Sequence, residues 1–304
     1  MRAVSQSSVS ENPGQAVTLV CDDGQSLGAT AFAATADPPI GTAVIAPAMG
    51  VPQAFYARFA GWLATRGIDA LTFDYRGIGA SRLISQRGRE VTLLDWGRAD
   101  LEAVLRHAVT PSDRPVFLIG HSMGGQLAGL APSSERLAAF VFIAASLPHW
   151  RLWPGARKYA LGAAWYALVP LLSTGHDRFP ARRLGFSSVD IPSGATMQWA
   201  RWGRQRRYLF SPALGLDTER YRSLSQPLLA YIADDDPYCP EAAARALLAE
   251  YPSAPARLVR VTADAVGGGP IGHFGFFREK MREPVWREIA QWLHAQAQGS
   301  LRDG

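Results

Sequence analysis

The sequence predicts an α/β fold in which helices cover both faces of a mostly parallel central sheet. Short apolar runs alternate along the chain with segments of helical spacing, as in strands joined by crossover helices. Residues 148–222 interrupt this alternation and are too many for a connector, which predicts an inserted helical cap. With 304 residues, of which 48% are hydrophobic, the chain can bury the core of one such domain.

The individual elements follow from local patterns. The turn signal Asp22-Asp23-Gly24 predicts an opening hairpin, and short apolar runs predict the buried strands after it. The expected strands are 16–21, 27–35, 42–46, 70–73, 115–119, 138–145 and 227–233. The expected helices are 54–66, 93–109, 126–130, 241–250 and a C-terminal segment. Structural roles in turns, caps or ion pairs are expected for Asp74, Arg76, Asp95 and Asp100.

These elements place the core of the domain at 16–147 and 223–298, after a flexible polar arm at 1–15. The arm contains a Pro-Gly pair and does not have the pattern of a signal peptide. No stretch approaches the roughly 20 apolar residues of a membrane span. We therefore expect a cytoplasmic protein.

A candidate nucleophile lies in the sequence Gly120-His121-Ser122-Met123-Gly124-Gly125, between an apolar run and a helical stretch. A serine at this sharp turn must adopt strained backbone angles, and small residues at 120 and 124 avoid the collisions that side chains would cause. The turn then presents the hydroxyl of Ser122. In a chain with 29 glycines such a motif can occur by chance, but the predicted strand before it and helix after it are the context that a nucleophile turn requires.

Such a serine needs a histidine base and an acid that orients it. Of the six histidines, His273 is the best candidate, because it lies in a glycine-flanked loop before the C-terminal helical segment. His121, inside the turn, is expected to be structural. Surface, loop or packing roles are expected for His107, His149, His176 and His294.

The acid is expected in Asp234-Asp235-Asp236, directly after the strand predicted at 227–233. The spacing Asp-x-x-x-Pro, counted back from Pro240, selects Asp236. A one-residue shift of the turn would select Asp235. At least one of the three is expected to be a turn residue or a cap of the helix at 241–250.

Residues 73–81, the serine turn, the acid run and residues 272–277 together resemble the α/β-hydrolase superfamily. The resemblance is greatest to a bacterial branch of predicted serine hydrolases without an assigned substrate. It covers roughly residues 17–295, with the motifs in the expected order. Related sequences read Asp-Asp-Glu at the acid run, which shifts weight toward Asp235. Many members carry His-Gly where this chain reads Pro47-Ala48-Met49-Gly50; by position, the backbone N–H groups of Met49 and Met123 should form the oxyanion hole.

The resemblance implies a serine hydrolase that cleaves a carboxylester with an apolar acyl or alcohol part through an acyl-enzyme. An acyltransferase with the same triad and a non-catalytic ligand-binding protein are the alternatives. A haloalkane dehalogenase is excluded, because its nucleophile would be an aspartate at position 122. The spacing of histidines and carboxylates predicts no metal or other cofactor, and no nucleic-acid-binding module is recognised.

The predicted cap differs from the core in composition. It holds five of the nine tryptophans, and its twelve basic and four acidic residues give +8, whereas the whole chain is +5. We expect Trp150 and Trp202 to contact substrate. The charge suggests an anionic substrate or an anionic membrane surface, contacted through the apolar helical face at 159–172. Alternatively, arginines such as Arg201 and Arg204 form a solvated face or pair with core carboxylates.

Overall fold

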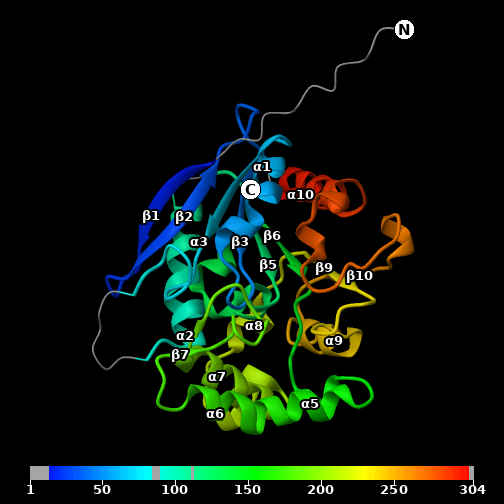
Figure 1. Cartoon of the computed structure of the whole chain (residues 1–304). Helices are drawn as coiled ribbons and strands as arrows, with labels where there is room; N and C mark the ends of the chain where they lie inside the picture. Colours follow the sequence, from blue (N-terminus) through cyan, green and yellow to red (C-terminus); the bar gives the residue numbers. More distant parts are fainter. Residues whose placement is uncertain (1–13, 84–89, 111–112, 301–304) are drawn as a thin grey trace, which may run out of the picture.

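The computed structural model describes residues 14–83, 90–110 and 113–300, and its centre is an eight-stranded sheet (Figure 1). The strand order is β1-β2-β4-β3-β5-β6-β9-β10; β2 pairs antiparallel with β1 and with β4, and the other neighbours are parallel. The strands are β1 (Gln15–Val20), β2 (Ser26–Phe32), β3 (Gly41–Ala46), β4 (Ile68–Phe73), β5 (Val116–His121), β6 (Ala139–Ile143), β9 (Leu228–Ala233) and β10 (Ala256–Val261). The predicted mostly parallel sheet is thus confirmed.

Helices cover both faces of this sheet (Figure 1). The helices of the core are α1 (Ala57–Ala64), α2 (Leu93–Asp95), α3 (Glu102–Val109), α4 (Met123–Gln126), α9 (Glu241–Leu248) and α10 (Arg287–Ser300). A π-helical turn, Trp96–Leu101, joins α2 to α3, so that the helix predicted at 93–109 is continuous. Side chains of α1 and α10 pack in one apolar cluster and those of α2, α3 and α4 in the other.

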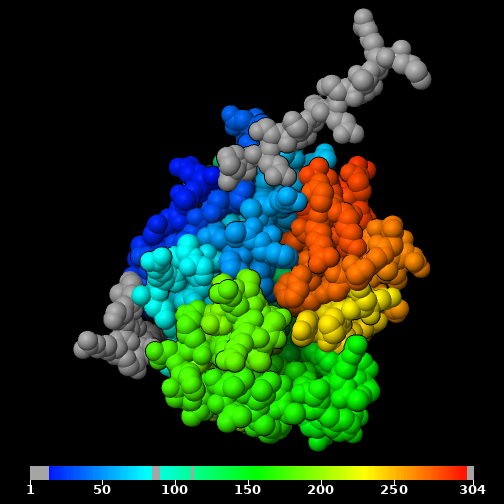
Figure 2. All heavy atoms as spheres, viewed as in Figure 1, coloured from blue at the N-terminus to red at the C-terminus, as the bar shows by residue number. Residues whose placement is uncertain are grey.

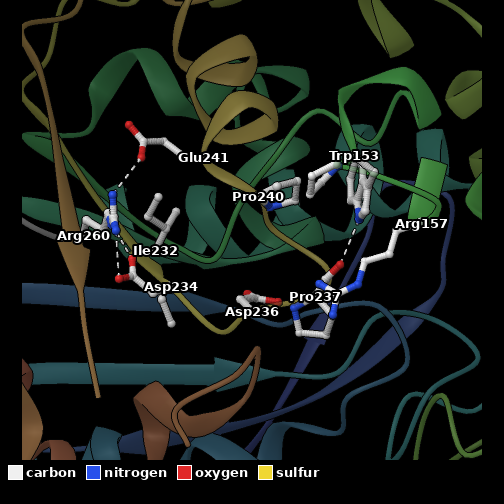
Figure 3. A pocket seen from close by; sticks show the side chains of 11 residues that line it. Trp153, Arg157, Ile232, Asp234, Asp236, Pro237, Pro240, Glu241 and Arg260 are labelled. Atoms are coloured by element: carbon white, nitrogen blue, oxygen red, sulfur yellow. Dashed lines mark hydrogen bonds and ion pairs between the residues drawn. The ribbon is translucent and has the colours of Figure 1, made fainter. Parts of the chain in front are cut away.

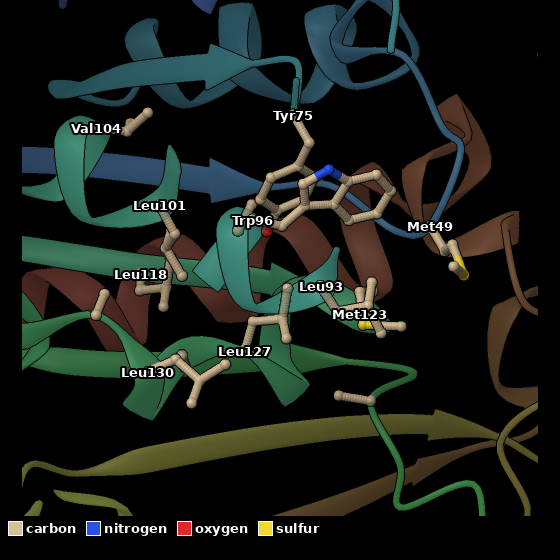
Figure 4. Packing of buried hydrophobic residues seen from close by; sticks show 14 of the residues in the cluster. Met49, Tyr75, Leu93, Trp96, Leu101, Val104, Leu118, Met123, Leu127 and Leu130 are labelled. Carbon is tan, nitrogen blue, oxygen red and sulfur yellow. The ribbon is translucent and has the colours of Figure 1, made fainter. Parts of the chain in front are cut away.

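The strands are buried on both sides, which explains their unbroken apolar sequences. On β5, Leu118 belongs to the same cluster as Trp96 and Leu130, whereas the next residue, Ile119, belongs to the cluster on the opposite face. Figure 4 shows Leu118 among the side chains of the first cluster. Each such side chain contributes about 1.5–3 kcal/mol when fully buried.

One strand was not predicted, one predicted helix has the wrong bounds, and one prediction lies mostly outside the described residues. The last strand, β10, was not expected, because it is an edge strand whose half-exposed, arginine-containing sequence lacks a clear apolar pattern. The helix expected at 126–130 begins earlier, at Met123, and gives way to a 3₁₀ turn at Ala128–Leu130. The predicted arm at 1–15 lies outside the described residues except for Gly14 and Gln15, and Gln15 belongs to β1.

The carboxylates expected to be structural are engaged as predicted. Asp74 accepts hydrogen bonds from the backbone N–H groups of Gln53 and Ala80, at 2.7 and 2.9 Å. Arg76 Nε donates to the buried Asp100 at 2.6 Å. Asp95 caps the start of α2, where it accepts from the backbone N–H of Thr92. These contacts fix the loop after β4 against the helices.

The segment predicted as the cap, 148–222, lies between β6 and β9 in sequence. It contains α5 (Arg157–Ala163), α6 (Val169–Ser173), α7 (Ser193–Arg204), the start of α8 (Glu219–Ser223) and the two-stranded pair β7 (Arg178–Phe179) and β8 (Ile191–Pro192). In Figures 1 and 2 the helices α5, α6 and α7 form a layer at one end of the molecule. Within the described residues, no helix combines the length and apolar character that a membrane crossing requires.

Candidate active site

Ser122 occupies the sharp turn between β5 and α4, with φ 50° and ψ −107°. These angles are disfavoured for a residue with a Cβ atom and mark local strain. A Cβ on Gly120 would lie 2.5 Å from the backbone nitrogen of Gly125, and one on Gly124 would lie 2.2 Å from the carbonyl oxygen of Ala46. Glycine is therefore required at both positions, as the sequence predicts.

His273 is held by a carboxylate. Its Nδ1 lies 2.8 Å from Oδ2 of Asp236, whose side chain is completely buried. The other oxygen, Oδ1, accepts the backbone N–H of Tyr238 at 2.7 Å. Both oxygens of Asp236 thus have partners that suit an ionised carboxylate, and the imidazole is fixed with Nδ1 as the donor.

Asp235 has a different role, which corrects the weight that the resemblance gives it. Its two oxygens accept the backbone N–H groups of Ile271 and Gly272, both at 2.8 Å. It therefore ties down the loop that carries His273 but does not contact the imidazole ring. The spacing to Pro240 points to Asp236, and on this point it is the better guide.

Asp234, the first of the three, faces away from the histidine. It forms an ion pair with Arg260 on the neighbouring strand β10, and Arg260 also lies 3.8 Å from Glu241 at the start of α9. Figure 3 shows this group on one side of the loop, with Asp236 and Pro237 on the other. The three adjacent carboxylates thus have three separate sets of partners.

His121 is structural, as expected, but its hydrogen bonds reach the site. Its Nε2 donates to the backbone carbonyl of His273 at 3.0 Å, so that Nδ1 is the acceptor for the hydroxyl of Tyr56 at 2.8 Å. The same hydroxyl accepts the N–H of Ala48 at 2.9 Å. Burial lowers the pKa of His121 well below its usual value, which keeps the ring neutral in this chain. One hydrogen-bonded chain therefore links the 47–50 loop, the serine turn and the histidine loop.

The two methionines predicted for the oxyanion hole lie beside the serine. Met49 and Met123 line the same cavity as Ser122, and Figure 4 shows both methionine side chains. Met123 is the first residue of α4, where a backbone N–H has no acceptor in a preceding turn. In the described ranges, no hydrogen bond engages either N–H. Both donors are thus free for a ligand.

Ser122 and His273 open into one cavity of about 360 Å³ between the core and the cap. No hydrogen bond within 3.5 Å joins them in the part of the chain that the structure describes; catalytic contacts of this kind often tighten only with substrate. Most of the lining is apolar, and none of the described residues that line it is Asp, Glu, Lys or Arg. The cap contributes Pro148, Trp153, Leu161, Ala164, Trp165, Leu168, Val169, Phe179, Leu184, Gly185, Phe186, Thr196 and Trp199.

The two tryptophans expected to contact substrate do not line this cavity, which corrects that prediction. Trp202 is buried inside the cap, where its ring packs edge-on against Tyr208 with centroids 5.4 Å apart. Trp150 lines a separate groove of about 700 Å³. The sequence marks the tryptophan-rich segment, but the side chains that turn toward the serine are decided by how the cap helices pack.

The arginines of the cap also lie away from the cavity. Arg204 Nε donates to the carbonyl of Trp165 at 2.8 Å, and its guanidinium lies over the ring of Tyr166. Arg207 pairs with Glu250, at 2.5 Å, beside the separate groove. Arg201 is exposed. The structure thus favours the alternative in which these residues make structural contacts or a solvated face.

Comparisons with known proteins agree with this architecture. Residues 37–170 match the model of a family described as serine aminopeptidase, S33. No protein of curated function matches the chain. The fold is similar to that of a soluble variant of monoglyceride lipase from Saccharomyces cerevisiae, solved with a substrate analog: TM-score 0.67, 18% identity, 97% of this chain and 99% of that chain covered.

Two esterase structures are also similar. A thermophilic esterase from Thermogutta terrifontis has a TM-score of 0.62 at 16% identity, over 93% of this chain and 99% of that chain. An esterase from Exiguobacterium antarcticum has a TM-score of 0.59 at 16% identity, over 91% of this chain and 99% of that chain. At these identities the likeness concerns the fold. With this sheet order, this serine turn and these matches, the chain has the α/β-hydrolase fold.

Proposed function

We propose that the protein is a serine hydrolase that cleaves a carboxylester through an acyl-enzyme. The observation that carries this proposal is a single cavity that contains both Ser122, on its strained turn, and His273, whose Nδ1 is bonded to the buried Asp236. The three side chains have the types and the order along the chain that nucleophilic acyl transfer requires. The similar structures named as esterases and a lipase support the same reaction class.

The residues would act as follows. Ser122 Oγ attacks the acyl carbonyl while Nε2 of His273 takes the hydroxyl proton. Asp236 keeps the proton of the imidazole on Nδ1 and stabilises the imidazolium. The N–H groups of Met49 and Met123 bind the oxyanion of the tetrahedral intermediate. Its collapse expels the alcohol, which receives the proton from His273, and water then releases the acid by the reverse sequence of roles.

The cavity favours a substrate whose buried part is apolar and uncharged. Its lining is mainly aromatic and aliphatic, and an ionised group there would lose hydration without gaining a countercharge. An anionic substrate part is therefore not supported by the described lining. A carboxylester with an apolar acyl or alcohol part fits the site best.

A contact between the outer face of the cap and an anionic lipid surface is a second, separate proposal. Tyr159 and Leu171 are 65% and 76% exposed on the cap helices, and Arg157 and Lys158 lie next to Tyr159. Exposed apolar side chains flanked by basic ones suit such a surface. Sedimentation with phosphatidylserine vesicles should bring down the wild type but not a variant with Tyr159→Ser and Leu171→Ser. The cytoplasmic location stays a prediction.

Labelling with a fluorophosphonate tests the proposed nucleophile. The probe should modify the wild type stoichiometrically, and Ser122→Ala should lose both the label and the hydrolysis of p-nitrophenyl esters. Ser146 offers a matched control, because its side chain lines the same cavity; Ser146→Ala should still be labelled. Labelling that survives Ser122→Ala would place the nucleophile elsewhere.

The products distinguish the alternatives. A hydrolase releases free acid whether or not an acceptor is added, whereas an acyltransferase forms a new ester or thioester with an added alcohol or thiol. A wild type that shows neither labelling nor turnover with any ester would instead favour a non-catalytic ligand-binding protein.

A further inference from the structure

One polar side chain in the apolar cavity is not used by the proposed mechanism. Gln126 is the last residue of α4, four positions after Ser122, and it lines the same cavity although only 2% of its surface is exposed. Burying an amide is unfavourable unless its polar atoms find partners. Its hydrogen bonds therefore show what this side chain is arranged to do.

The side-chain oxygen of this amide accepts a hydrogen bond from a buried tyrosine. The hydroxyl of the fully buried Tyr208 donates to Gln126 Oε1 at 2.8 Å, and the hydroxyl of Tyr221 donates to the Gln126 backbone carbonyl at 2.7 Å. Because Oε1 accepts from Tyr208, the NH₂ group is turned away from that hydroxyl. Throughout 14–83, 90–110 and 113–300, no protein acceptor binds this NH₂ group.

The position of Tyr208 is itself unusual. Its backbone has φ 51°, a left-handed conformation that bulky residues rarely adopt, and its ring packs edge-on against Trp202. Strained residues of this kind persist only where the surrounding structure determines them, and they cluster at functional sites. The strain and the hydrogen bond both concern the residue that orients Gln126.

We propose that Gln126 is a specificity-determining residue, whose NH₂ group donates a hydrogen bond to a neutral oxygen on the part of the substrate that fills the cavity. The proposal rests on the proposed esterase function. It implies an ester that carries an ether, keto or hydroxyl oxygen in addition to the scissile carboxyl group. Tyr208 acts through Gln126 and is a positioning residue. An all-carbon chain of the same length leaves the amide unpaired, and sites built to hydrogen-bond a ligand discriminate against such analogues.

The test uses ester series that differ by one oxygen. Straight-chain p-nitrophenyl esters, in which an ether oxygen replaces one methylene at a time along the acyl chain, are compared with the all-carbon ester. A second series places the oxygen along the alcohol chain. Each kcat/KM is divided by the rate constant for alkaline hydrolysis of the same ester, which removes differences in intrinsic reactivity. The wild type should prefer one oxygen position by about tenfold.

Gln126→Met should abolish this preference, while the control Gln291→Met, at an exposed position on α10, keeps it. If Gln126→Met does not fold, Gln126→Glu is the second variant, because it keeps the shape of the side chain and the acceptor for Tyr208. Assayed above pH 8, it replaces the NH₂ donor with a second acceptor. It should therefore lose the preference too. Tyr208→Phe should weaken the preference by releasing the amide.

Two results would overturn the inference: a wild type without preference in either series, or a preference that survives in the folded Gln126 variant. Fluorophosphonate labelling of every variant separates these results from a failure of the proposed function, which would abolish labelling of the wild type as well.

Discussion

The floor of the cavity, built by the core, and its wall, built by the cap, are organised in opposite ways. On the floor the polar groups are fixed by short hydrogen bonds: Asp236 to His273, Asp235 to the loop of His273, and Tyr56 to His121. On the wall, aromatic and aliphatic side chains dominate, and the arginines of the cap lie elsewhere. The difference suggests that, in the proposed function, the core sets the reaction and the cap sets the shape of the substrate.

The largest effect should come from the acid run. Asp236→Asn should lower kcat for a p-nitrophenyl ester by about 10⁴-fold, because the imidazole loses the group that fixes its tautomer. Asp234→Asn removes only a partly exposed pair with Arg260, and kcat should change less than twofold, because the carboxylate bonded to His273 is that of Asp236. Steady-state kinetics of the three single Asn variants decides between them. A large loss of kcat for Asp235→Asn, with little loss for Asp236→Asn, would instead indicate that Asp235 is the acid of the triad.

Substitution of a cap residue that lines the cavity should lower activity less than substitution of the acid. Trp199→Ala removes a ring that packs at 4.5 Å from Trp165, and kcat/KM for the best apolar ester should fall about tenfold to a hundredfold. The preferred chain should become longer, since the cavity grows. Trp150→Ala, in the separate groove, serves as the control and should leave the chain-length profile unchanged. Equal effects at the two positions would show that the cavity does not select the substrate.

A smaller effect on kcat is expected from Tyr56, which does not line the cavity but hydrogen-bonds to His121. Tyr56→Phe leaves the N–H of Ala48 and Nδ1 of His121 unpaired in a buried site, so the free energy of unfolding should fall by about 1–3 kcal/mol and kcat should fall by about tenfold. Tyr75→Phe is the matched control, because its buried hydroxyl has no hydrogen-bond partner among the residues that the structure describes. Urea unfolding and kinetics on both variants test this. If Tyr56→Phe and Tyr75→Phe lowered the free energy of unfolding equally, the hydrogen bonds of Tyr56 to Ala48 and His121 would not contribute to stability.

The smallest effect should come from the exposed charge of the cap. Arg201→Glu should change kcat/KM for a neutral ester and for an anionic ester of the same length equally, by less than about twofold, because exposed charges are screened at physiological salt. The kinetics should be measured at low and high ionic strength. A selective loss on the anionic ester that disappears in salt would show that the charge of the cap does reach the substrate.

The sequence predicted the sheet and the serine turn better than it predicted which tryptophans line the cavity. Buried parallel strands are apolar on both faces and so are visible in the sequence, whereas the edge strand β10 is half-exposed and was missed. Gly120 and Gly124 are visible for a similar reason, because the turn permits no larger side chain at those positions. Trp150 and Trp202 could not be told from Trp153, Trp165 and Trp199, because composition does not reveal the direction of a ring.

By itself, the sequence determined the features that depend on local residue patterns. These are the strands, the strained turn at Ser122 and the order of serine, aspartate and histidine along the chain. Only the tertiary structure decided between Asp235 and Asp236, connected His121 to His273, and turned the amide of Gln126 toward the cavity. The physical reason is range. Backbone strain and apolar periodicity act between near neighbours in the chain, whereas these hydrogen bonds join residues that are distant in sequence and depend on how the loops and the cap pack.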